Sequence, residues 1–282
     1  MAQPDCVYDE LRLTSSGFSR LAHFVTAELG IKMPESKIAM VKSRLLRRVR
    51  ELGCDSIETY LDQVFTGANS DEERWRLIDA ITTNKTDFFR EPEHFDFLTE
   101  TALPRLAAAR VRVWSAGCSS GEEPYTLAMI LSEYAEQRPG FAFDILATDV
   151  STRVLQHARS GIYEESAAEA VAPWLRRKYF LRSKDRSRGV LRIRPELRQL
   201  VSFHRLNFMQ SDYCIRDRFE AIFFRNVLIY FDKPTQEAVL NKVCRYLVPG
   251  GYLFISHSES LAGLAVPVVP LRAAVFRKPA AG

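Results

Sequence analysis

Apolar residues in the first part of the chain recur with the period of an α-helix. Five of them, spaced three or four positions apart, form one stripe: Ile38, Val41, Leu45, Val49 and Leu52. Gly53 follows the stripe and is expected to end that helix. Similar patterns predict helices near 17–29, 56–65 and 71–81, and no convincing strand occurs before residue 111. We therefore expect an all-helical N-terminal domain over residues 1–90.

The second part of the chain alternates short apolar runs with helical patterns. The runs predict strands at 111–116, 141–148, 219–224 and 252–256, with a last edge strand at 275–277. Helices are expected at 122–137, 151–160 and 232–247. Ser151 and Gly161 suit the ends of one helix, and Pro249-Gly250-Gly251 is expected to turn the chain into the strand at 252–256. This alternation predicts a doubly wound, mostly parallel α/β sheet with helices on both faces, in a domain over 91–282.

One segment interrupts this alternation. Residues 163–199 are long for a connection inside a compact domain, and a strand at 201–204 follows them. Strand-like pieces at 178–181 and 190–193 are joined by a polar turn at 183–189. We therefore expect an inserted antiparallel β-subdomain over about 163–199.

Composition and charge narrow the class of protein. The 282 residues are 46% hydrophobic, enough to bury a core, yet no run approaches the ~20 apolar residues of a membrane span. The N-terminus lacks the apolar segment of a signal peptide, and the five cysteines are dispersed, so we expect a cytoplasmic protein without a metal site. Two basic clusters, at 37–50 and 176–198, suggest an acidic partner, although such clusters are often only solvated surface.

The string VWSAGCSSGEEPY at 113–125 carries the main chemical signal. A predicted strand enters small residues and then a helix, which exposes backbone N–H groups at the carboxyl end of the sheet. The glycine pattern of dinucleotide-binding proteins and the lysine of phosphate-binding loops are both absent. Glu122 and Glu123 would repel a phosphate at this helix start. The string favours a ligand with an ammonium, hydroxyls or a sulfonium, and a simple tight turn is the alternative.

Polar residues near the ends of two further strands extend this signal. Asp149 ends the second strand, where an acid typically accepts hydrogen bonds from ribose hydroxyls, unless it only caps the next helix. Asn226 follows the third strand and can bond an adenine or ribose edge, and Tyr230 can turn its ring face toward a cation. In the alternative interpretation Asn226 forms a turn and Tyr230 packs in the core. Together these positions indicate a nucleoside ligand.

Five strings resemble the chemotaxis receptor glutamate methyltransferase family, over about residues 15–277: TTNKTDFFRE, VWSAGCSSGEEPYTLAM, ATDV, FFRNVLIYFDKPTQ and FISHSESL. The resemblance implies a helical N-terminal domain and an α/β domain that binds S-adenosyl-L-methionine and releases S-adenosyl-L-homocysteine. It also implies the residues that contact the cofactor: Asn84, Thr86, Arg90, Ala116, Gly117, Glu122, Asp149, Asn207, Phe208, Arg225, Asn226 and Val227. The family has Asn-Leu where this chain has Asn207-Phe208, so Asn207 is the better supported of the two.

The resemblance further implies methyl transfer to receptor glutamates. A glutamate carboxylate, with a pKa of about 4.3, is ionised at neutral pH, so no general base is needed and catalysis comes from positioning. Arg90 would orient a carboxylate and Tyr230 would hold the sulfur in line. Five basic residues would contact acidic cytoplasmic helices of the receptor: Lys37, Arg44, Arg47, Arg48 and Arg50. We expect a monomer that is recruited to receptor arrays without entering the membrane.

Three alternatives remain open at this point. The enzyme could methylate another protein or a small acid, or the chain could be a non-catalytic module that senses the cofactor or its product. Nucleic-acid binding is disfavoured, because the basic helix at 38–52 lacks interleaved aromatic residues. The sequence leaves undecided which receptor and which glutamates are chosen, what regulatory ligands act, and whether the β-subdomain docks a receptor peptide.

Overall fold

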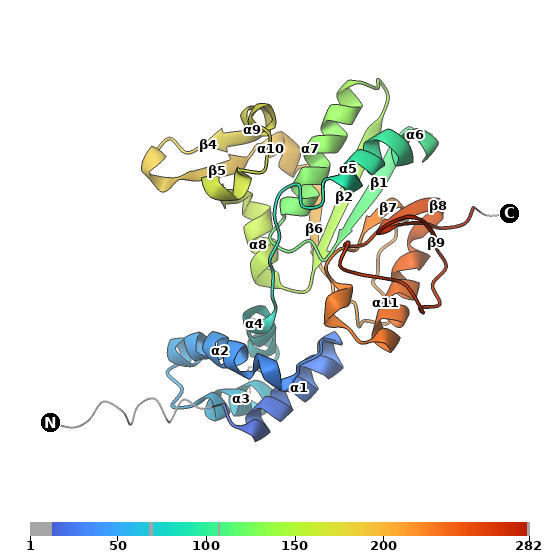
Figure 1. Cartoon of the computed structure of the whole chain (residues 1–282). Coiled ribbons are helices and arrows are strands. Elements are labelled where there is room, and N and C mark those ends of the chain that lie inside the picture. The colour runs from blue at the N-terminus through green and yellow to red at the C-terminus, as the bar shows by residue number, and fades with distance from the viewer. Residues whose placement is uncertain (1–12, 68–69, 107, 281–282) are drawn as a thin grey trace. The chain divides into compact units, whose positions relative to one another are not determined.

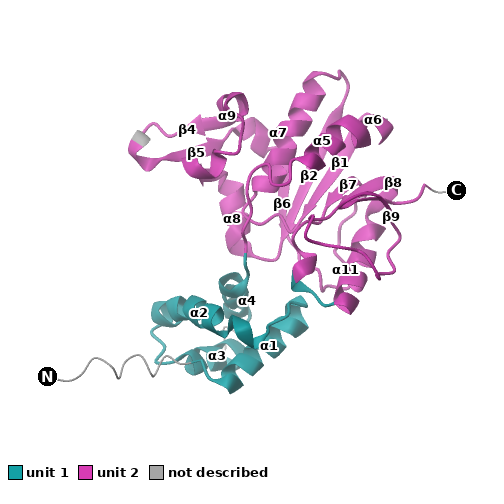
Figure 2. Cartoon of the chain, in the orientation of Figure 1, with its two compact units in different colours: residues 1–83, 230–232 teal, residues 84–229, 233–282 magenta. Residues whose placement is uncertain are grey.

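The computed structural model describes residues 13–67, 70–106 and 108–280. The chain forms two compact units (Figure 2): residues 1–83 with 230–232, and residues 84–229 with 233–282. The division therefore falls after Thr83, whereas the sequence analysis places it after Arg90. Among the described residues, no helix combines the length and the apolar character that crossing a bilayer requires.

The first unit is built from helices, as predicted. Its described part holds α1 (Ser15–Leu29), the 3-10 turn η2 (Glu35–Lys37), α2 (Ile38–Leu52), α3 (Ile57–Thr66) and α4 (Ser70–Ile81). Gly53 ends α2 in the left-handed conformation, and the Ser56 hydroxyl accepts the Thr59 N–H at the start of α3. Three residues of the predicted stripe of α2, Val41, Leu45 and Val49, are fully buried, whereas Leu52 at the end of the helix is exposed.

The second unit contains a seven-stranded sheet with the order β6-β2-β1-β7-β8-β10-β9 (Figure 1). Its strands are β1 (Arg110–Ala116), β2 (Ala142–Asp149), β6 (Val201–Arg205), β7 (Phe219–Phe223), β8 (Leu247–Phe254), β9 (Val269–Arg272) and β10 (Val275–Arg277). The first five pair in parallel, while β10 and β9 are antiparallel. This confirms the doubly wound, mostly parallel sheet. From β1, the strands β2 and β6 follow on one side and β7 and β8 on the other, so the strand order reverses between β1 and β7.

Helices cover both faces of the sheet. They are α5 (Glu93–Phe97), a π-helical turn (Leu98–Ala102), α6 (Leu103–Leu106), α7 (Glu122–Glu136), α8 (Thr152–Ser160) and α11 (Lys233–Arg245). Successive residues of β1 point to opposite faces. Val113 joins the core that includes Tyr125 of α7, whereas the Trp114 ring neighbours Tyr246, just after α11. Ser151 and Gly161 cap α8 as predicted.

The predicted β-subdomain is present between α8 and β6. Three antiparallel strands form it, in the order β3-β5-β4: β3 (Ile162–Glu164), β4 (Phe180–Arg182) and β5 (Val190–Ile193). Short helical segments complete it: η4 (Glu165–Ala168), α9 (Pro173–Tyr179), η5 (Arg186–Arg188) and α10 (Pro195–Arg198). The strand predicted at 178–181 is partly wrong, because α9 runs to Tyr179. Pro173 in the first turn of α9 favours that helix.

Three predictions near the C-terminus are wrong. Pro249-Gly250-Gly251 lies inside β8 instead of turning the chain, and the pairing of β8 with β7 shifts register between Phe219 and Ala221. The helix α11 ends at Arg245, two residues early. β10 is an inner strand, because β9 lies outside it; Pro270 is tolerated in β9 since that strand is at the edge of the sheet.

Candidate active site

The turn after β1 lies where the strand order reverses, which is where open α/β sheets bind ligands. Gly117 has a φ of +88°, and a Cβ there would lie 2.5 Å from Cγ2 of Val227, in the loop after β7. The N–H groups of Gly117 and Cys118 donate to the Thr148 carbonyl, at 2.8 and 2.9 Å. These bonds fix the turn to the end of β2. Only glycine suits both the backbone conformation and the close approach.

Asp149 lies at the end of β2, next to this turn. Its side chain is nearly buried; one carboxylate oxygen accepts the Ser119 N–H and the other accepts the Ser151 N–H, both at 2.9 Å. The helix-capping alternative is thus correct in part, because the Ser151 bond supports the start of α8. Each carboxylate oxygen has two lone pairs, so Asp149 retains the capacity to accept further hydrogen bonds.

Glu122 begins α7 and is also nearly buried. The Ser120 hydroxyl donates to its carboxylate at 2.7 Å. Burial raises the pKa of Glu122 to about 7, against the opposing effect of that hydrogen bond. A carboxyl with such a pKa gains its charge readily when a cationic ligand group approaches.

Arg225 follows β7 and is almost fully buried, with a side chain 2% exposed. It donates to Glu123 at 2.9 Å, to Glu91 at 3.0 Å and to the carbonyl of Arg90. Burial raises the pKa of Glu123, although Arg225 opposes that change. Burial also acts to raise the pKa of Glu91, but the Ser256 hydroxyl and Arg225 outweigh it and the pKa is lowered. These bonds favour a positioning role for Arg225 over the cofactor contact that the resemblance implies.

Asn226, the next residue, has a left-handed backbone with a φ of +60°. Its side-chain amide donates to the Ser256 hydroxyl at 2.8 Å, and its backbone N–H donates to Glu259 at 3.1 Å. The Ser256 N–H also donates to Glu259, at 2.8 Å. Asn226 is therefore fixed against the loop that follows β8.

The segment 84–91 meets the β1 turn, since the Ser119 hydroxyl donates to the Asn84 carbonyl at 3.1 Å. Within this segment Thr86 and Arg90 are half-buried, and an Arg90 Nη1 donates to the Lys85 carbonyl at 3.3 Å. Ala116 is buried at the end of β1. The structure thus brings Asn84, Gly117 and Asp149 to one edge of the sheet.

Three residues predicted to belong to the cofactor site contact other parts of the protein. Phe208 packs edge-on against Phe224, with ring centroids 5.0 Å apart, which favours a role in the core over a cofactor contact. The side-chain oxygen of Asn207 accepts the Met209 N–H at 3.0 Å. Tyr230 ends the 3-10 turn η6 (Leu228–Tyr230) and groups with the helical unit, where its hydroxyl donates to the Thr83 carbonyl at 3.2 Å.

The five basic residues predicted to contact the receptor, Lys37 of η2 and four arginines of α2, are only partly available for a partner. Arg48 forms two hydrogen bonds of 2.7 Å with Glu73, and Arg44 donates to the carbonyls of Ile81 and Thr82. Lys37 donates to the Lys32 carbonyl at 3.1 Å. Arg47 and Arg50 are exposed, as the helical spacing predicts, although Arg47 also forms an ion pair with Glu51 at 3.0 Å. The surface charge of α2 is therefore smaller than the sequence suggests.

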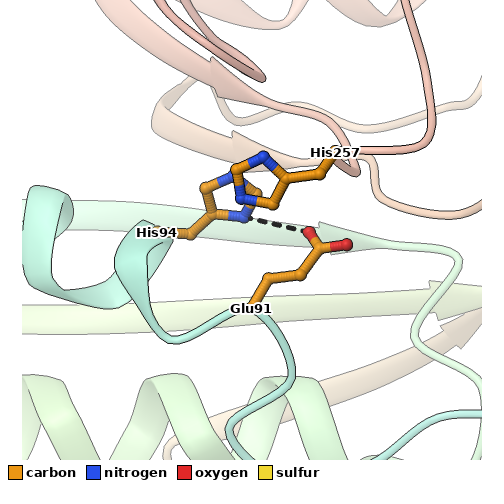
Figure 3. A group of neighbouring side chains, drawn as sticks. All are labelled: Glu91, His94 and His257. Atoms are coloured by element: carbon orange, nitrogen blue, oxygen red, sulfur yellow. Dashed lines mark ion pairs between the residues drawn. The ribbon is translucent and has the colours of Figure 1, made fainter.

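Glu91, His94 and His257 place one ligand atom each within 4.8 Å of the others (Figure 3). His94 is fully buried, and burial, followed by Arg225, lowers its pKa to about 3. The two imidazoles stack with planes 15° apart and ring centroids 4.8 Å apart, so their in-plane lone pairs lie in two separate, nearly parallel planes and do not converge on one point. Glu91 already forms an ion pair with Arg225. We interpret Glu91 as part of the polar network around Arg225, and the three residues together not as a metal centre.

Two family models together match most of the chain. The all-alpha domain of CheR methyltransferases matches residues 16–82, and the SAM binding domain of CheR methyltransferases matches residues 84–270. The chain belongs to the CheR methyltransferase family. It carries the SAM binding domain of that family, so its cofactor is S-adenosylmethionine.

Relatives of this CheR family member are similar over nearly their full length. The chemotaxis protein methyltransferase of Salmonella typhimurium is 41% identical over 90% of this chain and 87% of its own. That of Escherichia coli is 38% identical over 91% of this chain and 88% of its own. The solved plantazolicin methyltransferase BpumL covers 80% of this chain and 66% of its own, at 13% identity and a TM-score of 0.34, which supports no argument about activity.

The residues at the sheet edge fit S-adenosylmethionine. The close approach of Gly117 to Val227 leaves no room for a side chain, and two nearly buried acids, Glu122 and Asp149, suit a cationic nucleoside better than a phosphate. Sequence reasoning missed the supporting role of Glu91, Ser256 and Glu259. Their strings carry the family resemblance, but nothing in the strings separates these residues from their neighbours.

Proposed function

We propose that this CheR family member transfers the methyl group of S-adenosylmethionine to glutamate side chains of chemotaxis receptors and forms methyl esters. The observation that carries the proposal is the near full-length similarity to chemotaxis protein methyltransferases. The chemistry is consistent with it, because an ionised carboxylate attacks an activated methyl without a general base. The bond from the methyl carbon to sulfur breaks as the ester bond to oxygen forms.

The family resemblance suggests a role for each of the chain's own residues. The cofactor supplies a methyl group activated by a sulfonium. Asp149 would accept the ribose hydroxyls, and Glu122 would pair with the ammonium group. Asn84, Thr86 and Asn226 would line the same edge. Arg90 would orient a carboxylate, and Tyr230 would align the sulfur with the incoming oxygen.

Alkaline release of methanol tests the reaction. Purified protein is incubated with methyl-labelled cofactor and receptor-containing membranes, and the methylated receptor is treated with mild base. Volatile label is expected, because esters hydrolyse and N-methyl groups do not. Label that resists base would identify another acceptor. Cofactor binding without any transfer would support the sensing module instead.

Glu122 predicts a pH dependence of cofactor binding. Its folded pKa of about 7 lies above the ordinary value, so its contribution to stability is lost as pH rises through 7. The cationic cofactor binds the ionised form, so cofactor affinity should increase several-fold from about pH 6 to about pH 7.5. Calorimetry measures this change. Glu122→Gln should remove the pH dependence and Glu100→Gln, at an exposed site, should keep it; a flat profile for the wild type would contradict the pairing.

The exposed arginines of α2 predict a salt-dependent encounter with the receptor. Single exposed ion pairs contribute less than about 1 kcal/mol, so the effect needs several charges. We expect receptor methylation at low receptor concentration to fall as ionic strength rises. The double variant Arg47→Gln/Arg50→Gln should weaken this dependence, while Arg20→Gln, on α1, should preserve it. Equal rates at low and high salt would exclude steering by α2.

A further inference from the structure

The backbone is left-handed on both sides of Arg90. Phe89 and Glu91 each have a φ of +55°, and neither is glycine. Side chains with a Cβ disfavour this conformation, so it persists only where surrounding contacts fix it. Such strained positions concentrate at functional sites. We therefore expect contacts with other parts of the protein to hold the segment 89–91 in this conformation.

The Glu91 carboxylate is the main such group. One of its oxygens accepts the Ser256 hydroxyl at 2.7 Å, and the other accepts an Arg225 N–H at 3.0 Å. The Ser256 oxygen in turn accepts the side-chain amide of Asn226, at 2.8 Å. Glu91 thereby joins its own segment to the loops that follow β7 and β8.

Contacts from α7 hold the same segment from another direction. The Phe89 N–H donates to the Thr126 hydroxyl at 3.2 Å. Arg225 donates both to the Arg90 carbonyl and to Glu123, in the first turn of α7. The main chain at Arg90 is therefore tied through Arg225 to the two carboxylates Glu91 and Glu123.

We propose that Glu91 is a positioning residue for methyl transfer, which acts through Arg225 on Arg90 and through Ser256 on Asn226. This inference rests on the proposed function, because the proposed function assigns Arg90 to the orientation of a carboxylate. A displacement of about 1 Å at a reacting group can lower the rate ~100-fold. A carboxylate that fixes the backbone of Arg90 can therefore control the rate without touching the substrate.

Three variants of Glu91 separate positioning from simple stability. Glu91→Ala removes the carboxylate and leaves a strained backbone, and Glu91→Gly removes the carboxylate but suits a positive φ. Glu91→Gln retains the size and one acceptor for Arg225. Glu93→Ala, at an exposed acid two residues along, is the matched control. The kcat of methyl transfer, the Kd of the cofactor and the Tm are measured for each.

We expect kcat to fall ~100-fold in both Glu91→Ala and Glu91→Gly, with a smaller loss in Glu91→Gln. The Tm of Glu91→Gly should exceed that of Glu91→Ala, and Glu93→Ala should behave like the wild type. Wild-type kcat in folded Glu91→Gly would overturn the proposal, because the side chain would then only support the backbone. The wild type is assayed first for alkali-labile label, so a failure of the proposed function is seen separately.

Discussion

Arg90→Ala is expected to lower methyl transfer ~100-fold or more while the protein stays folded. Arg90 is half-buried, and its side chain donates to the carbonyl of Lys85 only weakly, at 3.3 Å, so truncation removes little packing. The guanidinium carries two parallel donors that match a carboxylate, and its loss leaves the reacting oxygen poorly oriented. The rate with labelled cofactor and receptor membranes gives the effect, and the Tm reports the fold.

Two control variants sharpen this test of Arg90. Arg90→Lys keeps the charge but loses the planar fork, so it should recover only part of the rate. Arg105→Ala removes an exposed arginine of α6 and should leave the rate unchanged. Wild-type turnover in Arg90→Ala would exclude the orienting role. A large fall in Tm would instead show that Arg90 supports the fold.

Asp149→Ala is expected to weaken cofactor binding by one to two orders of magnitude. Hydrogen bonds to a charged group contribute about 1.5–3 kcal/mol each, and Asp149 is expected to accept them from the ribose. The same substitution leaves the N–H groups of Ser119 and Ser151 without their acceptor. The ligand contact and the shape of the turn are therefore lost together. Calorimetry with the cofactor or its demethylated product measures the change in Kd.

The controls for Asp149 separate these two contributions. Asp149→Asn keeps one acceptor oxygen but places an NH₂ donor against the N–H of either Ser119 or Ser151, so its affinity for the cofactor should still be reduced. Asp144→Ala, at a half-buried acid earlier in β2 that pairs with Arg110, should bind the cofactor normally. An unchanged Kd in Asp149→Ala would remove Asp149 from the cofactor site.

Local signals in the sequence were sufficient for most elements of the fold. Gly53 and Gly161 end helices because a left-handed residue closes the last turn, and that requirement depends on the chain nearby. The predictions are wrong where the position of neighbouring strands in the sheet decides the local structure. Pro249-Gly250-Gly251 resembles a turn, yet β8 continues through it, because pairs with β7 on both sides, at Leu247 and at Tyr252, hold the strand. Pro270 is accepted because β9 lies at the edge.

For the candidate site, too, some features follow from the sequence and others only from the tertiary structure. The sequence by itself indicated a nucleoside ligand, because the turn at Gly117 and the acid at Asp149 are features of short segments at strand ends, and the family resemblance implied S-adenosylmethionine. Only the tertiary structure decided that Arg225 turns inward to Glu91 and Glu123, and that Arg44 and Arg48 serve the helical unit. A guanidinium can point to solvent, to a ligand or to a buried carboxylate. Residues far away in the sequence supply that carboxylate, so no local pattern encodes the choice.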